Sequence, residues 1–131
     1  MGYNPEIFLF GRILVSGFFI MGSLSHFKGL DMMSKYAASK KVPMPKLAVS
    51  LTGLMLLFGG LSILFGVYTL YGIGLLTLFL AVVSFKMHNF WAVPEKEKME
   101  QQINFTKNMA LLGSLLMFLA ISQPWAYALS F

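Results

Sequence analysis

The sequence has 131 residues and no cysteine; 57% of its residues are hydrophobic and only 11% are charged. An average soluble domain has about 25% charged residues, and a domain this small exposes much of its surface to water. The composition therefore excludes an ordinary soluble globular protein and a disordered chain. It predicts a single transmembrane domain, residues 1–131, whose outer surface faces lipid. The lack of cysteine excludes disulfides and thiol chemistry performed by this chain itself.

Four apolar stretches, at about residues 7–27, 47–67, 68–86 and 108–129, dominate the sequence. Each is long enough to cross a hydrocarbon core of about 30 Å as a helix. Backbone groups in lipid must bond within their own segment, which favours helices. The second and third stretches almost abut, and so short a connection forces an antiparallel hairpin. The predicted fold is all-α, an integral membrane antiparallel four-helix bundle.

The first and third connections are longer, and each predicts a short helix on the membrane surface. In the first connection, Leu30, Met33 and Ala37 share one helical face. In the third connection, residues 93–106, Pro94 stands at a favourable helix start. We therefore expect an interfacial helix in each of these two connections.

The basic residues predict the orientation. Nine of them lie on the side shared by the first and third connections: Lys28, Lys35, Lys40, Lys41, Lys46, Lys86, Lys96, Lys98 and Lys107. The opposite side has only Arg12, inside the first stretch. The positive-inside rule places both long connections in the cytoplasm and both termini outside, in a multi-pass protein of the plasma membrane. This pattern accounts for the net charge of +5 without nucleic acid as a partner.

Polar side chains inside the apolar stretches follow single helical faces, and such residues usually face the bundle interior. Three of these faces meet at the predicted cytoplasmic end. The sequence therefore predicts a polar pocket there for a quinone head group, a lipid phosphate or an anionic small molecule. The candidate residues from this pattern are Arg12, Ser16, Ser23, His26, Lys28, Ser84, His88, Lys107 and Asn108.

Structural interpretations of the same residues stay open. The lysines can extend from helix ends to the head groups, and the histidines can satisfy hydrogen bonds between helices. Arg12 can reach the membrane surface or bond to carbonyls of neighbouring helices. No metal site is predicted, because the two histidines have no cysteine or paired carboxylate near them in the sequence. Trp91 and Trp125 are predicted as anchors at the two membrane interfaces.

Three segments resemble a known family. They are Gly11-Arg12-Ile13-Leu14 with a later His26-x-Lys28, then His88-Asn89-Phe90-Trp91, and Phe105-Thr106-Lys107-Asn108-Met109-Ala110-Leu111-Leu112-Gly113. In order and spacing they resemble the DoxX family of small four-helix bacterial and archaeal membrane proteins over nearly the whole chain. Ser114 departs from the family pattern, in which a second glycine is common. The resemblance implies functional positions at Arg12, Lys28, His88, Phe90, Trp91, Lys107 and Asn108.

The resemblance also implies an association with membrane redox systems, including thiosulfate:quinone oxidoreductase subunits and thiol or oxidative-stress complexes. We therefore expect an accessory subunit with a polar intramembrane pocket for a quinone- or lipid-sized ligand. Quinone is the only cofactor considered, and the expected partners are the lipid bilayer and other membrane or redox subunits. The alternatives are a stand-alone quinone-linked oxidoreductase or small-molecule carrier, and a purely structural subunit of a larger membrane complex. The sequence leaves open whether the chain is an enzyme.

Overall fold

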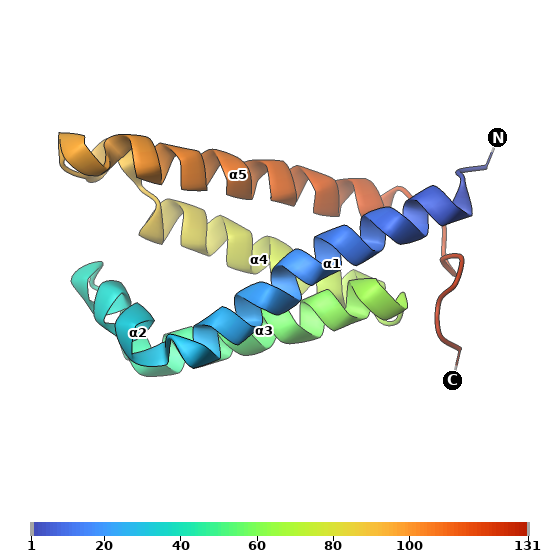
Figure 1. Cartoon of the computed structure of the whole chain (residues 1–131), viewed down its shortest axis with the longest axis horizontal. Helices are drawn as coiled ribbons and strands as arrows, with labels where there is room; N and C mark the ends of the chain where they lie inside the picture. The colour runs from blue at the N-terminus through green and yellow to red at the C-terminus, as the bar shows by residue number, and fades with distance from the viewer. Residues whose placement is uncertain (1, 131) are drawn as a thin grey trace.

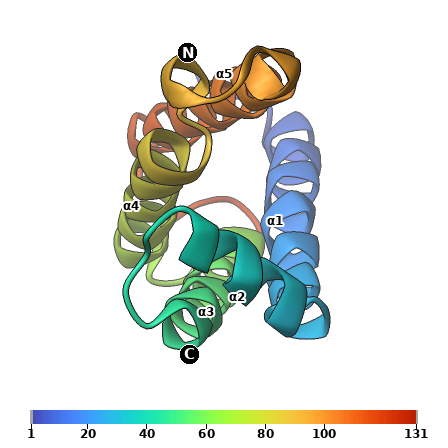
Figure 2. The same cartoon turned by 90° about the vertical axis from the view of Figure 1, so that its left-hand side faces the viewer.

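The computed structural model describes residues 2–130. Its regular secondary structure within that range is helical, and no strand is present there. Four long helices run beside one another: α1 (Pro5–Lys28), α3 (Pro45–Phe65), α4 (Thr69–Met87) and α5 (Glu95–Leu119). The short α2 (Leu30–Ser39) lies across one end, and a 3-10 turn, η1 (Phe90–Ala92), joins α4 to α5. Figure 1 shows this arrangement from the side, and Figure 2 shows α2 in front of the bundle, between α1 and α4.

Local sequence signals explain where the helices begin and turn. Asn4 caps α1, because its side-chain oxygen accepts a hydrogen bond from the backbone N–H of Ile7 at 2.9 Å. Pro45 stands in the first turn of α3, where its missing N–H costs nothing. Gly66 ends α3 with a φ of 70°, a left-handed conformation that favours glycine. The predicted tight hairpin between the second and third apolar stretches is therefore present as α3 and α4.

Three segments are long and apolar enough to cross a membrane: Pro5–Lys28, Pro45–Phe65 and Thr69–Ala92. They correspond to the first three predicted spans. The outer faces of these helices expose large apolar side chains; Ile7, for example, is 73% exposed, Met21 68% and Leu70 67%. A soluble monomer rarely exposes so continuous an apolar surface. These exposed faces fit lipid as their surroundings.

The last third of the chain differs from the sequence expectation. Residues 93–106 do not form a separate short helix, and the helix expected to end near residue 129 ends at Leu119. Instead, α5 is one continuous helix of 25 residues, which begins after Pro94 with Glu95 and Glu97 in its first turn. Acidic residues favour a helix N-terminus, and no proline interrupts the residues that follow. Residues 120–130 are irregular, and Pro124 disfavours helix at Gln123, the residue before it.

The helix expected in the first connection is present as α2, with Met33 and Ala37 directed toward the bundle. Ala37 is only 4% exposed. Between the long helices, a continuous apolar core holds α1, α3, α4 and α5 together. It is built from Phe19, Leu56, Ile63, Ile73, Leu76, Leu80, Leu115 and Trp125.

Candidate functional site

The predicted site residues divide between the two ends of the bundle, and Arg12 belongs to the end opposite α2. Its side chain is fully buried and donates three hydrogen bonds to backbone carbonyls. Nε bonds to Ile63 O at 3.1 Å, one terminal nitrogen to Leu64 O at 2.7 Å, and the other to Ala126 O at 2.6 Å. Two interpretations were open for Arg12: that it reaches the membrane surface, or that it bonds to carbonyls of neighbouring segments. The structure supports the second.

Aromatic rings close over this guanidinium. Its central carbon lies 5.3 Å from the centroid of the Trp125 ring and 5.7 Å from that of Phe8. Trp125 is 2% exposed, so the prediction that it anchors the membrane interface is wrong. The irregular C-terminal segment folds back onto the bundle, where the Leu129 N–H donates to Phe65 O at 2.9 Å. Arg12 therefore joins α1, the end of α3 and the C-terminal segment.

Three predicted serines are buried between the helices and do not line a cavity. Ser16 Oγ donates to Ile13 O of its own helix at 3.2 Å. The hydroxyls of Ser23 and Ser84 have no hydrogen-bond partner among residues 2–130. Small side chains allow close helix approach, and these three serines fit that role.

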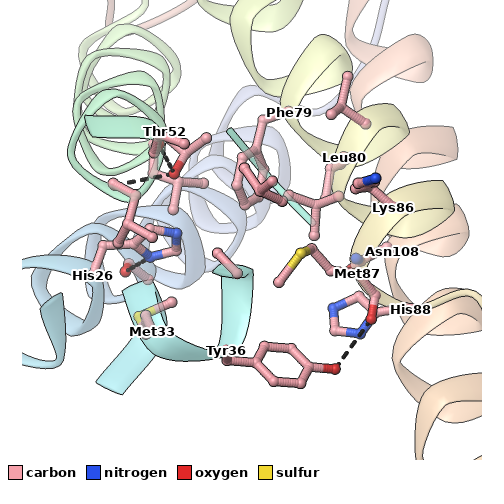
Figure 3. Close-up of a pocket in the computed structure, with 18 of the residues that line it drawn as sticks. His26, Met33, Tyr36, Thr52, Phe79, Leu80, Lys86, Met87, His88 and Asn108 are labelled. Carbon is pink, nitrogen blue, oxygen red and sulfur yellow. Dashed lines mark hydrogen bonds between the residues drawn. The ribbon is translucent and has the colours of Figure 1, made fainter. Parts of the chain in front are cut away.

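A cavity of about 680 Å³ lies at the α2 end of the bundle. Helices α1, α3 and α4 form its walls and α2 lies at its end, where Met33 and Tyr36 line it (Figure 3). Its apolar lining includes Phe19, Met33, Val49, Leu56, Phe79, Leu80 and Val83. Its polar lining is limited to a few groups, namely His26, Tyr36, Thr52, Lys86, His88 and Asn108. Mostly apolar walls with a few convergent polar groups are typical of small-molecule sites.

The two histidines lie on opposite sides of the cavity (Figure 3). His26 extends from α1, and its Nδ1 is 2.9 Å from Gly22 O. His88 follows α4, and its Nδ1 is 2.8 Å from the side-chain oxygen of Gln101 in α5. In each ring, Nδ1 is hydrogen-bonded to a protein oxygen. Nε2 is the nitrogen that remains for a ligand.

A hydrogen-bond chain connects His88 to α2. Gln101 Nε2 donates to the Tyr36 hydroxyl at 3.3 Å, and that hydroxyl donates to Met87 O at 3.2 Å. Lys40 Nζ adds a second link, donating to Asn89 Oδ1 at 3.0 Å. These bonds attach α2 to the ends of α4 and α5 and so hold it against this end of the cavity.

Tyr36 and Gln101 are not among the residues predicted from the sequence. A signal for Gln101 was present, because it precedes the candidate Asn108 by seven residues and shares its helical face. No such signal existed for Tyr36, whose contacts depend on where α2 folds. Burial is the main cause that raises the pKa of Tyr36; the Gln101 bond opposes it, and Glu97 and Glu100 add to it. Tyr36 therefore keeps its proton as pH rises to its ordinary pKa and beyond.

Four other predicted residues lie outside the cavity. Lys28 is exposed, and Lys107 is exposed with its Nζ 5.7 Å from the Phe18 ring centroid. Phe90 and Trp91 instead pack around Phe105, with ring centroids 5.5 and 5.7 Å away from it. Of the eleven candidates, the cavity brings together His26, His88 and Asn108.

The described residues contain no group of three or more histidine, cysteine or carboxylate side chains placed to hold a metal ion. Asp31 is the acidic residue nearest to His26 in the sequence, and its Oδ1 lies 3.8 Å from Lys46 Nζ on the surface. The groups in the cavity lining that can form hydrogen bonds include the two imidazoles, the Asn108 amide and the Tyr36 hydroxyl.

Comparison with known proteins places the chain among membrane proteins. The DoxX family model matches residues 7–89, which include most of α1, all of α2 to α4, and both histidines. The inner membrane protein YphA of Escherichia coli strain K12 is 30% identical over 126 residues, which cover 96% of this chain and 89% of YphA. No solved structure matches the chain.

Proposed function

This chain belongs to the DoxX family, and from that premise we propose that it is an accessory subunit of a membrane redox system that binds a quinone- or lipid-sized ligand between its helices. The observation that carries the proposal is the cavity at the α2 end. Its apolar walls suit a ring and alkyl chain, while His26, His88 and Asn108 provide hydrogen-bonding groups for the polar atoms of the ligand. Without cysteine, the chain would act in thiol systems through partner subunits.

The architecture we propose is a single transmembrane domain of four crossings. The fourth crossing is α5, which lies along α4 for much of its length (Figure 1). At 1.5 Å per residue its 25 residues extend about 37 Å, which exceeds the hydrocarbon thickness. Its charged first turns would reach the water phase. The short α2 would lie at the interface, with Met33 and Ala37 toward the cavity.

The loop charges favour the α2 end as cytoplasmic. A reporter at the C-terminus should therefore be outside: an alkaline phosphatase fusion should be active and a green fluorescent protein fusion dark. The matched control places the same reporters after Lys41, between α2 and α3, where the pattern should reverse. A fluorescent C-terminal fusion with inactive phosphatase would contradict the orientation.

A bulky side chain inside the cavity should block ligand binding. Thr52 lines the wall formed by α3, so Thr52→Trp should lower the affinity for a short-chain alkylquinone by about tenfold or more. The control is Leu54→Trp on the exposed side of α3, which should bind as the unmodified protein does. Affinity is measured by calorimetric titration in nanodiscs. Equal binding by both variants would place the ligand elsewhere.

Two other functions make different predictions. A stand-alone quinone-linked oxidoreductase or carrier would turn over or transport the ligand when purified without partners. A purely structural subunit would assemble with its partners equally well when His88 is replaced by alanine and would bind no quinone. An accessory subunit with a ligand site should co-purify with redox subunits after mild detergent extraction and should lose quinone binding in the Thr52→Trp variant.

A further inference from the structure

The protonation of the cavity histidines follows from the groups that hold their Nδ1 atoms. The Met87 carbonyl can only accept, so the Tyr36 hydroxyl donates to it. Having used its single proton, the Tyr36 oxygen accepts from Gln101, which must present its NH₂ group to Tyr36. The other end of the same amide, its oxygen, therefore faces His88. A backbone carbonyl thus fixes the direction of the whole chain of bonds.

His88 must donate to this amide oxygen, because the oxygen has no proton to give. Nδ1 of His88 therefore carries hydrogen, and in the neutral ring Nε2 carries a lone pair. Gln101 is 7% exposed, so water does not compete freely for its amide. The tautomer of His88 is consequently set by Tyr36, a residue of a different helix.

The same rule applies to His26. Its Nδ1 faces Gly22 O at 2.9 Å, and a carbonyl can only accept, so Nδ1 is again the protonated nitrogen. No residue between 2 and 130 makes a hydrogen bond to Nε2 of either histidine. In their neutral forms, the two rings therefore offer hydrogen-bond acceptors to whatever occupies the cavity.

Resting on the binding function proposed above, we propose that the cavity selects the hydroxyl form of its ligand's head group, a hydroquinone or phenol, over the carbonyl form. A hydroxyl donates to a histidine Nε2 and still accepts from the amide of Asn108, which also lines the cavity. A quinone carbonyl can accept from Asn108 but meets only a lone pair at Nε2. Buried polar groups left without a partner weaken binding, and this favours the hydroquinone.

The tautomer is tested directly by ¹⁵N nuclear magnetic resonance of histidine-labelled protein in nanodiscs at about pH 8, where imidazole is ordinarily neutral. The protein has two histidines, so single replacements assign both signals. We expect both rings protonated at Nδ1. Tyr36→Phe should release the Gln101 amide and give His88 a mixture of tautomers, while His26 stays unchanged. An Nε2-protonated His88 in the unmodified protein would overturn the inference.

Ligand selection is tested with 2-hexylhydroquinone, its dimethyl ether and 2-hexylbenzoquinone, kept under nitrogen. The ether keeps the ring, the hexyl chain and the acceptor oxygens of the hydroquinone, but a methyl group replaces each hydroxyl hydrogen and both donors are lost. We expect the hydroquinone to bind about tenfold or more tightly than either other probe. The preference should fall in the His88→Phe variant. Tyr71 is an exposed tyrosine, so Tyr71→Phe is the control for Tyr36→Phe. It should leave the preference for the hydroquinone unchanged.

The outcomes separate this inference from the function on which it rests. Equal affinity for the three probes would overturn the selection of the hydroxyl form while leaving a ligand site in the cavity. If none of the probes binds, and Thr52→Trp changes nothing, both the site and its selectivity are overturned. Tighter binding of the benzoquinone would overturn the selection of the hydroxyl form, because a donor such as the Asn108 amide, and not the histidine acceptors, would then decide the preference.

Discussion

Replacing Arg12 with methionine should lower the free energy of unfolding by about 4 kcal/mol or more. Three backbone carbonyls, of Ile63, Leu64 and Ala126, would lose their charged donor in the protein interior. Bonds to a charged group contribute about 1.5–3 kcal/mol each, and buried acceptors without partners add to the loss. Unfolding is measured thermally in detergent. Trp125 lies against the guanidinium. Its emission wavelength in the methionine variant should shift at a lower temperature than the one at which helix content is lost.

Two further variants separate the shape of the guanidinium from its charge. Arg12→Lys keeps the charge but cannot donate to three carbonyls in the same fixed geometry, so it should recover only part of the stability. Lys28→Met is the matched control at the other, exposed end of α1 and should change little. Normal stability of the methionine variant would mean that water or lipid head groups reach these carbonyls. That result would contradict the buried role of Arg12.

Gly59→Leu should separate α3 from α4 and destabilise the fold by about 3 kcal/mol or more. A Cβ atom at Gly59 would lie 2.7 Å from Cδ2 of Leu76 and 3.1 Å from the Gly72 carbonyl oxygen. Neither neighbour can retreat easily, because Leu76 is fully buried and Gly72 O belongs to a helix backbone. The larger side chain therefore has no space while the helices keep their distance. Thermal unfolding and the yield of monodisperse protein measure the effect.

Gly74→Leu provides the matched control on α4. A Cβ atom at Gly74 has nothing within 4 Å, and leucine favours helix more than glycine does. This variant should be as stable as the original protein or slightly more so. If both leucine variants have the same thermal stability, then helix propensity, and not close packing, determines whether leucine is tolerated at these two positions. The contact between α3 and α4 would then be looser than the structure shows.

The candidate site was partly predictable. The predicted topology placed His26, His88 and Asn108 at one end. The helical faces predicted that they point inward, because residues separated by three, four or seven positions share a face. The same pattern wrongly placed Lys28 and Lys107 in the pocket, because a long side chain at a helix end can turn outward. It also could not show that Phe90 and Trp91 pack with Phe105 beside the cavity. Periodicity shows which residues share a face of one helix, but it does not show which neighbour covers that face.

What the sequence alone determined was the environment and most of the helices. Long apolar stretches must hydrogen-bond within themselves in lipid, so their length and composition are sufficient to predict α1, α3 and α4. Local signals also place α2 and the α3–α4 hairpin. The prediction was wrong where the chain is less apolar. There α5 begins and ends earlier than its hydropathy indicated.

Only the tertiary structure decided the contacts between segments distant in the chain. Arg12 meets Ala126, and Tyr36 meets Gln101, across separations of 114 and 65 residues. Such pairs depend on the angles and distances at which the helices pack, which arise from many side chains together. The fold therefore makes Arg12 a structural clamp, and it sets the tautomer of His88 through a helix that the sequence assigned only to the surface.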